Sequence, residues 1–376
     1  MISIFKSVSG VLTALMPYPQ PHPAILRLTL SIIVPVYNGG EKFRKCLSSL
    51  FQADPSPQEI IVVADGDTDG SWRVGEELGA KVVRMSKQGG PARARNEGAR
   101  AAKGEILLFI DADVIVPPDM VSRIVRTFQG YPHLSALFGS YDDTPGETNF
   151  LSQYKNLFHY YIHQTSGEEA STFWGACGAI RRQVFMELGG FDESYRQPSI
   201  EDIELGYRLK GAGYRIRLDK GLQIRHLKRW TSLRLLKSDF FYRALPWAGL
   251  IWRNRRFIND LNLRGRYRLS VMMVWGFLIG MGWAFHRPES LAVAGFLALS
   301  LVLLNMPVYR FFARKRGFWF ALKVIPWHWL YYFYCGLAFF LGFLRYFFLE
   351  HFFRKPDPPK ALSRFPRTEH NREESP

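Results

Sequence analysis

The stretch GEILLFIDADV, residues 104–114, decides the fold of this chain. Its Ile106–Ile110 run is short, continuous and apolar, which predicts a strand that is buried on both faces. Asp111 and Asp113 follow at the carboxyl end, and because side chains alternate along an extended chain, both should project the same way. Two adjacent carboxylates repel each other unless a cation lies between them, and a divalent metal shared with phosphate oxygens is the usual solution. A strand that ends in an ordinary polar turn would look the same, so the flanking sequence has to decide.

Strands and helices alternate around this stretch. The strands are expected at 28–34, 59–64, 80–85 and 104–110, with a helix after each of the first three. This alternation predicts an α/β fold with a mostly parallel sheet flanked by helices. We expect Pro35 to end the first strand, because proline cannot donate to the ladder. Ligands bind beyond the carboxyl ends of the strands in such sheets, where Asn38, Asp65, Asp111 and Asp113 should face one crevice.

A dinucleotide-binding Rossmann domain has the same layout and is the first alternative. That fold needs Gly-x-Gly-x-x-Gly after the first strand, whereas this chain has PVYNGG at 35–40. It also leaves the paired aspartates unexplained, so we set it aside.

Positive charge is concentrated just before the apolar C-terminal part. The chain of 376 residues has a formal net charge of +16, and residues 225–268 hold twelve Lys or Arg against two acidic residues. Basic residues beside a bilayer contact anionic headgroups and mark the cytoplasmic side. The charge therefore indicates a membrane surface rather than nucleic acid, for which no recognition module is evident.

Two apolar segments predict a hairpin of membrane spans. They cover 269–285, with 17 residues, and 290–309, with 20, and the basic residues that follow place both ends of the hairpin in the cytoplasm. Residues 327–349 are a third candidate span, and Pro326 should separate them from an interfacial or re-entrant piece at 318–325. A large soluble core is the alternative for these segments.

Five motifs in register resemble family 2 glycosyltransferases. They are PVYN at 35–38, ADGDTDGS at 64–71, GGPARARNEG at 89–98, DAD at 111–113 and Glu201-Asp202. The resemblance implies the GT-A nucleotide-sugar-binding fold and an inverting reaction. With it, the chain divides into an apolar or interfacial segment and linker at 1–27, a GT-A domain at 28–230, basic interfacial helices at 231–268, a transmembrane region of two to three spans at 269–353, and a disordered tail at 354–376.

The resemblance implies a donor site at the strand ends. The turn holding Pro35, Tyr37 and Asn38 is similar to the segment that lines the nucleoside pocket, where Tyr37 can supply a flat wall for the base. Asp65 resembles the carboxylate that accepts hydrogen bonds from the base. Arg95 stands where the family has a basic residue near the nucleotide, although an exposed helix arginine is the ordinary alternative.

The resemblance also implies a site for Mn²⁺ or Mg²⁺. Asp113 is the expected direct ligand, and Asp111 lies nearer the ribose and diphosphate. His226 is a further candidate ligand, because some GT-A enzymes use a histidine after the base in this way; a packed or surface histidine is the alternative.

Glu201 and Asp202 resemble the acceptor-side acids of the family. The resemblance makes Asp202 the general base and Glu201 its neighbour on the acceptor hydroxyls. Inverting transfer needs such a base, because an acceptor hydroxyl loses its proton as it attacks the anomeric carbon. Ser199 is a candidate N-cap, so the two acids could instead only stabilise the start of a helix.

Together these features predict a metal-dependent, inverting glycosyltransferase of the hexosyltransferase type that adds a single sugar. Its donor would be a nucleoside-diphosphate sugar, UDP-linked in our prediction, and its acceptor a lipid-linked or membrane-associated glycan. It would be a multi-pass protein of the cell inner membrane, with a cytoplasmic catalytic domain and a role in cell-envelope glycan biosynthesis.

Two alternatives stay open. A processive polysaccharide synthase is one, since HLKRW at 226–230 is a near miss to the Gln-x-x-Arg-Trp motif of those enzymes. The histidine at the Gln position argues against a processive synthase, but Trp230 remains a candidate wall of the acceptor site. A non-catalytic membrane scaffold with the same fold is the other.

Overall fold

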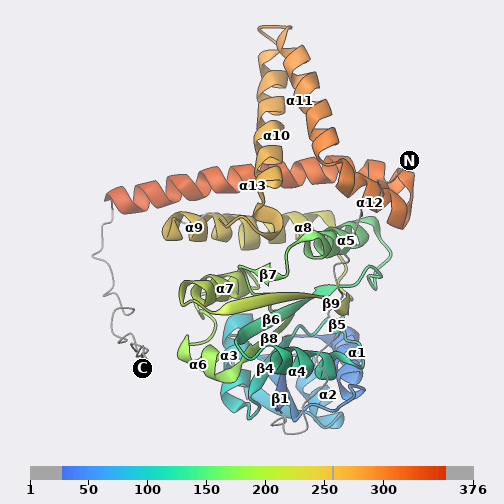
Figure 1. The fold of residues 1–376 in the computed structure, drawn as a ribbon, viewed down its shortest axis with the longest axis vertical. Helices are drawn as coiled ribbons and strands as arrows, with labels where there is room; N and C mark the ends of the chain where they lie inside the picture. Colours follow the sequence, from blue (N-terminus) through green and yellow to red (C-terminus); the bar gives the residue numbers. More distant parts are fainter. Residues whose placement is uncertain (1–27, 256–257, 353–376) are drawn as a thin grey trace, which may run out of the picture.

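The computed structural model describes residues 28–255 and 258–352. The segment predicted at 1–27 and the tail predicted at 354–376 lie outside the described residues. An α/β domain forms one end of the molecule, a layer of helices covers it, and a helical hairpin projects from that layer (Figure 1).

The described residues of the α/β domain form a nine-stranded sheet in the order β3-β2-β1-β4-β8-β6-β9-β5, with β7 paired to β9. The strands are β1 Leu30–Val36, β2 Glu59–Asp65, β3 Lys81–Met85, β4 Ile106–Ile110, β5 Val114–Ile115, β6 Leu134–Tyr141, β7 Glu169–Ala170, β8 Cys177–Arg181 and β9 Arg215–His226. The half from β3 to β4 is parallel, as predicted, whereas β8 runs antiparallel to both β4 and β6. The sheet is therefore mixed rather than mostly parallel.

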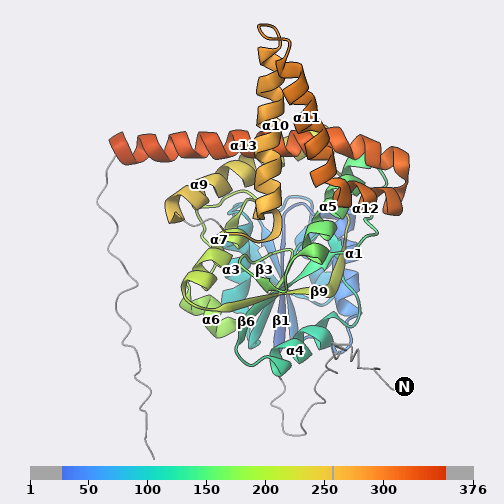
Figure 2. The same cartoon turned by 45° about the horizontal axis from the view of Figure 1, so that its top comes forward.

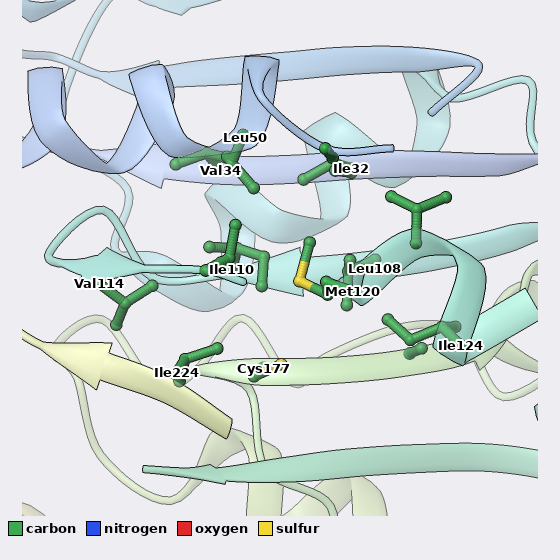
Figure 3. Packing of buried hydrophobic residues seen from close by; sticks show 14 of the residues in the cluster. Ile32, Val34, Leu50, Leu108, Ile110, Val114, Met120, Ile124, Cys177 and Ile224 are labelled. Carbon is green, nitrogen blue, oxygen red and sulfur yellow. The ribbon is translucent and has the colours of Figure 1, made fainter. Parts of the chain in front are cut away.

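Strand β4 is the centre of the sheet, and all five of its residues are buried. Its alternate side chains enter two different cores: Leu108 and Ile110 pack on the side of α1 and α4 (Figure 3), and Phe109 packs on the side of α3, α6 and α7. The helices of the α/β domain are α1 Gly40–Phe51, α2 Ser71–Glu77, α3 Pro91–Ala101, α4 Met120–Gly130, α5 Phe150–Thr165, α6 Arg182–Glu187 and α7 Glu201–Gly211. Burial on both faces explains why the strand is apolar at every position.

The first strand does not end at Pro35. Strand β1 continues to Val36, and Pro35 stays in register with Val63 of β2. On its other side β1 pairs with β4 only as far as Ile33. Beyond that point no described strand pairs with this side of β1, so Pro35 lies where the ladder continues on one side only.

The described residues of the C-terminal part form helices joined by short loops. Its elements are α8 Ser232–Lys237, the π-helical η1 Ser238–Ala244, α9 Leu245–Asn254, the 3₁₀ turn η2 Leu261–Leu263, α10 Gly265–Trp283, α11 Ser290–Leu304, α12 Met306–Arg316 and α13 Phe318–Phe352. Helices α10 and α11 form the predicted hairpin (Figure 1).

Two predicted boundaries in this part are wrong. The segment 290–309 is not one straight helix: α11 and α12 meet at an angle of 57°, because the chain turns at Asn305, which is buried and donates a hydrogen bond to Ser270. Pro326 does not separate two elements, since it lies inside α13. A proline removes only one helical hydrogen bond, and the buried Val324 and Tyr332 on either side hold the helix together by packing.

Among the described helices, only α13, over Phe318–Phe348, is by itself long and apolar enough to cross a bilayer. If the bent pair of α11 and α12 is counted as a single span, there are two candidates. This result suggests association with a membrane and does not establish the predicted multi-pass arrangement. In both views α13 lies across the base of the hairpin (Figures 1 and 2), so the two cannot cross one bilayer side by side.

Candidate active site

Arg95 of α3 joins the donor and acceptor sides of the predicted site. Its guanidinium donates to Asp111 Oδ1 and to Glu201 Oε1, both at 2.8 Å, and the side chain is only 6% exposed. Burial by itself lowers the pKa of Arg95, but Asp111, Glu201 and Asp202 together raise it above its ordinary value, so the group is charged. The alternative of an exposed helix arginine is wrong. Arg95 fixes the acids after β4 against the start of α7.

Asp202 lies at the start of α7 and lines a cleft. Its two carboxylate oxygens accept the backbone N–H groups of Gly175 at 3.0 Å and Ile203 at 2.8 Å. Burial, followed by the nearby Glu201, raises the pKa of Asp202 to about 6, against the lowering effect of Gly175, Arg95 and Ile203. A carboxylate with this pKa accepts a proton more readily than an ordinary aspartate at neutral pH.

Ser199 is not the N-cap of α7. The cap position is Ile200, and the Ser199 hydroxyl instead donates to the carbonyl of Tyr242 at 2.6 Å. Glu201 is occupied as well, by the backbone N–H of Ser199 and by Arg95. The acids therefore do more than stabilise a helix end, because Glu201 anchors Arg95 while Asp202 faces the cleft.

Asp113 and His226 face each other at the opposite end of the site. The Asp113 Oδ2 and His226 Nε2 atoms are 3.7 Å apart, and strands β5 and β9 hold the two residues in place through the pairing of Val114 with His226. The His226 ring stacks on Tyr141, with ring centroids 4.4 Å apart. Burial alone raises the pKa of Asp113, but His226, Lys228 and Lys42 lower it below its ordinary value, so Asp113 is ionised.

This pair fits a divalent cation only in part. A carboxylate oxygen and an imidazole nitrogen suit Mn²⁺, and 3.7 Å is longer than a hydrogen bond yet close enough for one cation to contact both atoms. Within the described residues, however, no group of three or more His, Cys, Asp or Glu could hold a metal by itself. A cation here would need further ligands, and diphosphate oxygens are the natural ones.

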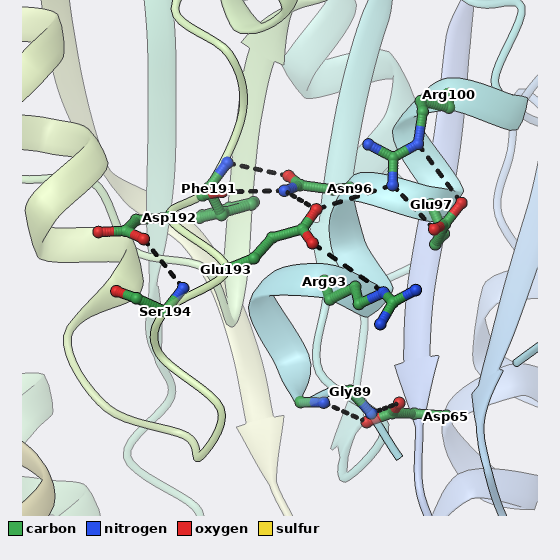
Figure 4. A network of polar contacts seen from close by, with 11 residues as sticks. Asp65, Gly89, Arg93, Asn96, Glu97, Arg100, Phe191, Asp192, Glu193 and Ser194 are labelled. Carbon is green, nitrogen blue, oxygen red and sulfur yellow. Dashed lines mark hydrogen bonds and ion pairs between the residues drawn. The ribbon is translucent and has the colours of Figure 1, made fainter. Parts of the chain in front are cut away.

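The predicted base-binding residues hold the loops around the strand ends. Both oxygens of Asp65 accept backbone N–H groups, from Gly89 at 2.6 Å and Gly90 at 2.9 Å (Figure 4). Asn38, in a left-handed conformation with φ of 50°, accepts the N–H of Thr68 at 2.8 Å.

Tyr37 is 48% exposed, and Pro35 lies in β1 two residues before it. An exposed ring at this edge of the sheet is free to contact a ligand. The contacts of Asp65 and Asn38 give these two residues a structural role, and their predicted contacts to a nucleoside remain predictions.

A cleft of about 160 Å³ extends from Asp202 toward the helical layer. Sequence reasoning missed most of its lining, including Trp174, Lys155, Arg243, Trp247 and Tyr334. Trp174 belongs to the Gly/Ala-rich TFWGACG run, which marks a close backbone approach; the others carry no local signal.

Trp230 is not a wall of this cleft. It is only 5% exposed and its backbone N–H donates to Ser152, so it belongs to the packed interior.

The fold and this arrangement define a GT-A domain, and comparison with known proteins gives the family. Residues 31–189 match the sequence model of Glycosyl transferase family 2, so this part of the chain is a domain of that family.

Two similar proteins illustrate the match. Glycosyltransferase GlyG of Streptococcus pneumoniae serotype 4 is 31% identical over 105 residues, which cover 27% of this chain and 35% of GlyG. Poly-beta-1,6-N-acetyl-D-glucosamine synthase of Staphylococcus aureus is 22% identical over 200 residues, covering 50% of this chain and 48% of the synthase. The chain thus spans half or less of each of these relatives.

A solved structure matches more of the chain. Mannosyltransferase PcManGT of Pyrobaculum calidifontis, in complex with GDP-Man and Mn²⁺, superposes with a TM-score of 0.54 at 17% identity, covering 86% of this chain and 90% of that one. The likeness shows a common fold.

Proposed function

We propose that the protein is an inverting glycosyltransferase that moves one sugar from a nucleoside-diphosphate donor, UDP-linked by preference, to a hydroxyl of a lipid-linked or membrane-associated glycan. The observation that carries the proposal is Asp202, a half-buried carboxylate with a raised pKa that lines a cleft and is tied through Glu201 and Arg95 to Asp111. An ordinary helix-capping aspartate would have no such cleft beside it.

The chemistry is a single displacement at the anomeric carbon. An acceptor hydroxyl in the cleft gives its proton to the Asp202 carboxylate as its oxygen forms the new bond to the sugar. The bond from the anomeric carbon to the diphosphate breaks at the same time, and the nucleoside diphosphate leaves with the electron pair. Arg95 holds Asp111 and Glu201 in place on the two sides of this reaction; its ion pair with Glu201 is buried, whereas the Asp111 side chain is 34% exposed.

Asp113 and His226 would hold the metal, Mn²⁺ or Mg²⁺, with Asp111 beside it. The carboxylate oxygen of Asp113 and the imidazole nitrogen of His226 suit such a cation, which supports this assignment. The Mn²⁺ bound in the mannosyltransferase of the same fold supports it as well. When bound, the cation would offset the negative charge that develops on the leaving diphosphate.

Membrane attachment would bring the enzyme to its acceptor. Large apolar side chains of the α10–α11 hairpin are exposed, among them Ile279, Trp283, Phe285 and Phe296. Helix α10 is about 28 Å long at ~1.5 Å per residue, close to the thickness of a hydrocarbon core. We place the hairpin in the inner membrane, α13 along its surface, and the catalytic domain on the cytoplasmic side with the basic residues.

The test is sugar transfer by the full chain in detergent or nanodiscs, with a panel of UDP- and GDP-sugars and with Mn²⁺ or Mg²⁺ present. Replacing Asp202→Asn should lower kcat/KM about 100- to 10,000-fold, because the base is lost. Asp113→Ala should lower activity and raise the metal concentration that is needed. Full activity in either variant contradicts the role given to that residue, and no turnover of any donor by the wild type would favour a non-catalytic scaffold.

Processive synthesis is the second candidate, since one relative is a polysaccharide synthase. Mass spectrometry of the product separates the two: a single added sugar supports the proposal, and a long polymer supports the synthase.

A further inference from the structure

Among the described residues, the cleft is lined by one charged basic side chain that forms no ion pair with a carboxylate. Lys155 lines the cleft, but its Nζ contacts both oxygens of Asp239 at 2.7 Å. Burial lowers the pKa of His159 well below its usual value, and it lowers that of His163 to about 3, so both rings are uncharged. The remaining basic side chain of the cleft is Arg243.

Arg243 makes no ion pair with a carboxylate among the residues that the structure describes. Part of the residue is exposed to solvent, and its side chain lines the same cleft as Asp202 and Trp247. Burial by itself lowers the pKa of Arg243, while Asp239, Tyr141, Asp202 and Glu201 raise it, so the guanidinium is charged and lies within electrostatic reach of the base. Arg243 belongs to η1, a π-helical segment, and such segments are frequent at functional sites.

The cleft continues toward apolar surface. Its far side is formed by Trp247 of α9 and by Tyr334 and Cys335 of α13. The same two helices form a second, mainly apolar hollow of about 270 Å³ further along, lined by Ile251, Trp252, Arg255, Phe343, Tyr346 and Phe347. Helices α9 and α13 pack against each other between the two hollows, where Gly342 lies against Ala248. A ligand with a polar head in the cleft and an alkyl tail along this helix pair would contact both.

We infer that the Arg243 guanidinium binds the phosphate that links the acceptor sugar to a lipid chain, and that the lipid lies along α9 and α13. A guanidinium binds phosphate oxygens through two parallel N–H bonds, which gives both affinity and orientation. Bound in this way, the phosphate would fix the acceptor so that a sugar hydroxyl reaches Asp202. The inference rests on the proposed transfer to a lipid-linked acceptor and names the chemical group that the acceptor carries.

Binding is tested first, because it needs no turnover. The full chain in nanodiscs of neutral phosphatidylcholine is titrated with a long-chain alkyl phosphate, and inorganic phosphate serves as the comparison probe. Arg243→Gln should weaken binding of the alkyl phosphate about 10- to 100-fold, the loss expected for charge-assisted hydrogen bonds. Arg234→Gln is the matched control, since Arg234 is an exposed residue of α8 that does not line the cleft, and it should change nothing.

Two results would overturn the inference at this step. One is equal binding of the alkyl phosphate by wild type and Arg243→Gln. The other is inorganic phosphate binding as tightly as the alkyl phosphate, which would show that the site takes free phosphate and not a lipid headgroup.

Turnover then separates acceptor from donor. With a sugar linked through phosphate to a long-chain alcohol, Arg243→Gln should raise the acceptor KM and leave the donor KM unchanged; with the same sugar on a neutral alkyl glycoside, it should have no effect. A raised donor KM would place Arg243 on the donor diphosphate and refute the inference. Absence of transfer by the wild type would refute the proposed function alone, because the binding result stands without it.

Discussion

At the scale of single residues, the chemistry of the site depends on which charged side chains form ion pairs with each other. Arg95 forms ion pairs with both Asp111 and Glu201, and Lys155 forms one with Asp239. The Asp202 carboxylate, in the part of the chain that the structure describes, accepts hydrogen bonds from backbone N–H groups alone. A base has to be free of cations at contact distance, or its proton affinity falls. Arg95 contacts the neighbours of Asp202 and not Asp202 itself, so burial and the nearby Glu201 raise the pKa of Asp202 more than Gly175, Arg95 and Ile203 lower it.

The pH dependence follows from Asp202. Below its pKa the carboxyl is protonated and cannot accept the acceptor's proton, so kcat/KM should rise about tenfold per pH unit up to a midpoint near pH 6 and then level off, as the pKa of about 6 requires. A pH–rate profile of kcat/KM at fixed metal checks this. A midpoint near pH 4, the ordinary range of an aspartate, would contradict the burial of this group.

Removing Arg95 should destabilise the domain. Arg95→Met leaves Asp111 and the buried Glu201 without their partner, and breaking a buried ion pair costs about 3–5 kcal/mol. The free energy of unfolding by urea measures the loss. Arg100→Met on the same helix is the control: its partners are Glu97 and Glu193, its side chain is 54% exposed, and the change should stay below about 1 kcal/mol. Equal losses of stability in the two variants would contradict the proposal that the ion pairs of Arg95 stabilise the domain.

At the scale of elements, the α10–α11 hairpin depends on close approach between its helices. A Cβ at Gly276 would lie 3.0 Å from Leu297, and one at Gly280 would lie 3.3 Å from the Cβ of Ala294. Small residues four apart on one helix are the common way for membrane helices to pack closely, because the helices gain only packing contacts there. Gly276 and Gly280 therefore allow the two helices to lie close together. The exposed apolar residues of the hairpin determine whether it favours lipid or water.

A substitution pair tests this packing. Gly280→Leu should push the helices apart and lower the thermal midpoint of the full chain in detergent by several degrees, since overpacking costs about 1–3 kcal/mol. Gly282 has no atom within 4 Å of its added Cβ, so Gly282→Leu should leave the midpoint nearly unchanged. If both variants unfolded at the same temperature, the contact between the helices would not be the cause.

At the scale of the whole molecule, the crossing of α13 and the hairpin limits how the protein can be oriented in a membrane. Only one of them can run along the bilayer normal (Figures 1 and 2). Hydropathy selects α13, whereas the hairpin projects away from the catalytic domain and exposes Ile279, Phe285 and Phe296. Inserting the hairpin leaves α13 flat at the interface, where one face stays on the protein and the other meets lipid.

Two lysine substitutions separate these orientations. Ile279→Lys places a charge near the middle of the hairpin and should cost ~2.5–3.5 kcal/mol if the hairpin is inserted, so much less protein should resist alkaline extraction from membranes. Leu341→Lys places the charge on α13, where an interfacial helix allows the ammonium to reach water, and should have little effect. The opposite ranking would make α13 the span.

The sequence by itself determined the buried strand β4, the parallel half of the sheet and the positions of the acidic motifs, because strand length, apolar continuity and turn residues are local properties. It could not determine which charges meet. Arg95 resembles a surface residue in its own helix, yet its partner Glu201 is 106 positions away, and Arg243 is one of many basic residues until η1 turns it into the cleft. Only the tertiary structure places these groups together, since ion pairing and cleft formation depend on the packing of elements that are distant along the chain. The direction of α13 was decided in the same way, because apolar composition sets a preference for lipid or core but carries no information about the angle between one helix and the next.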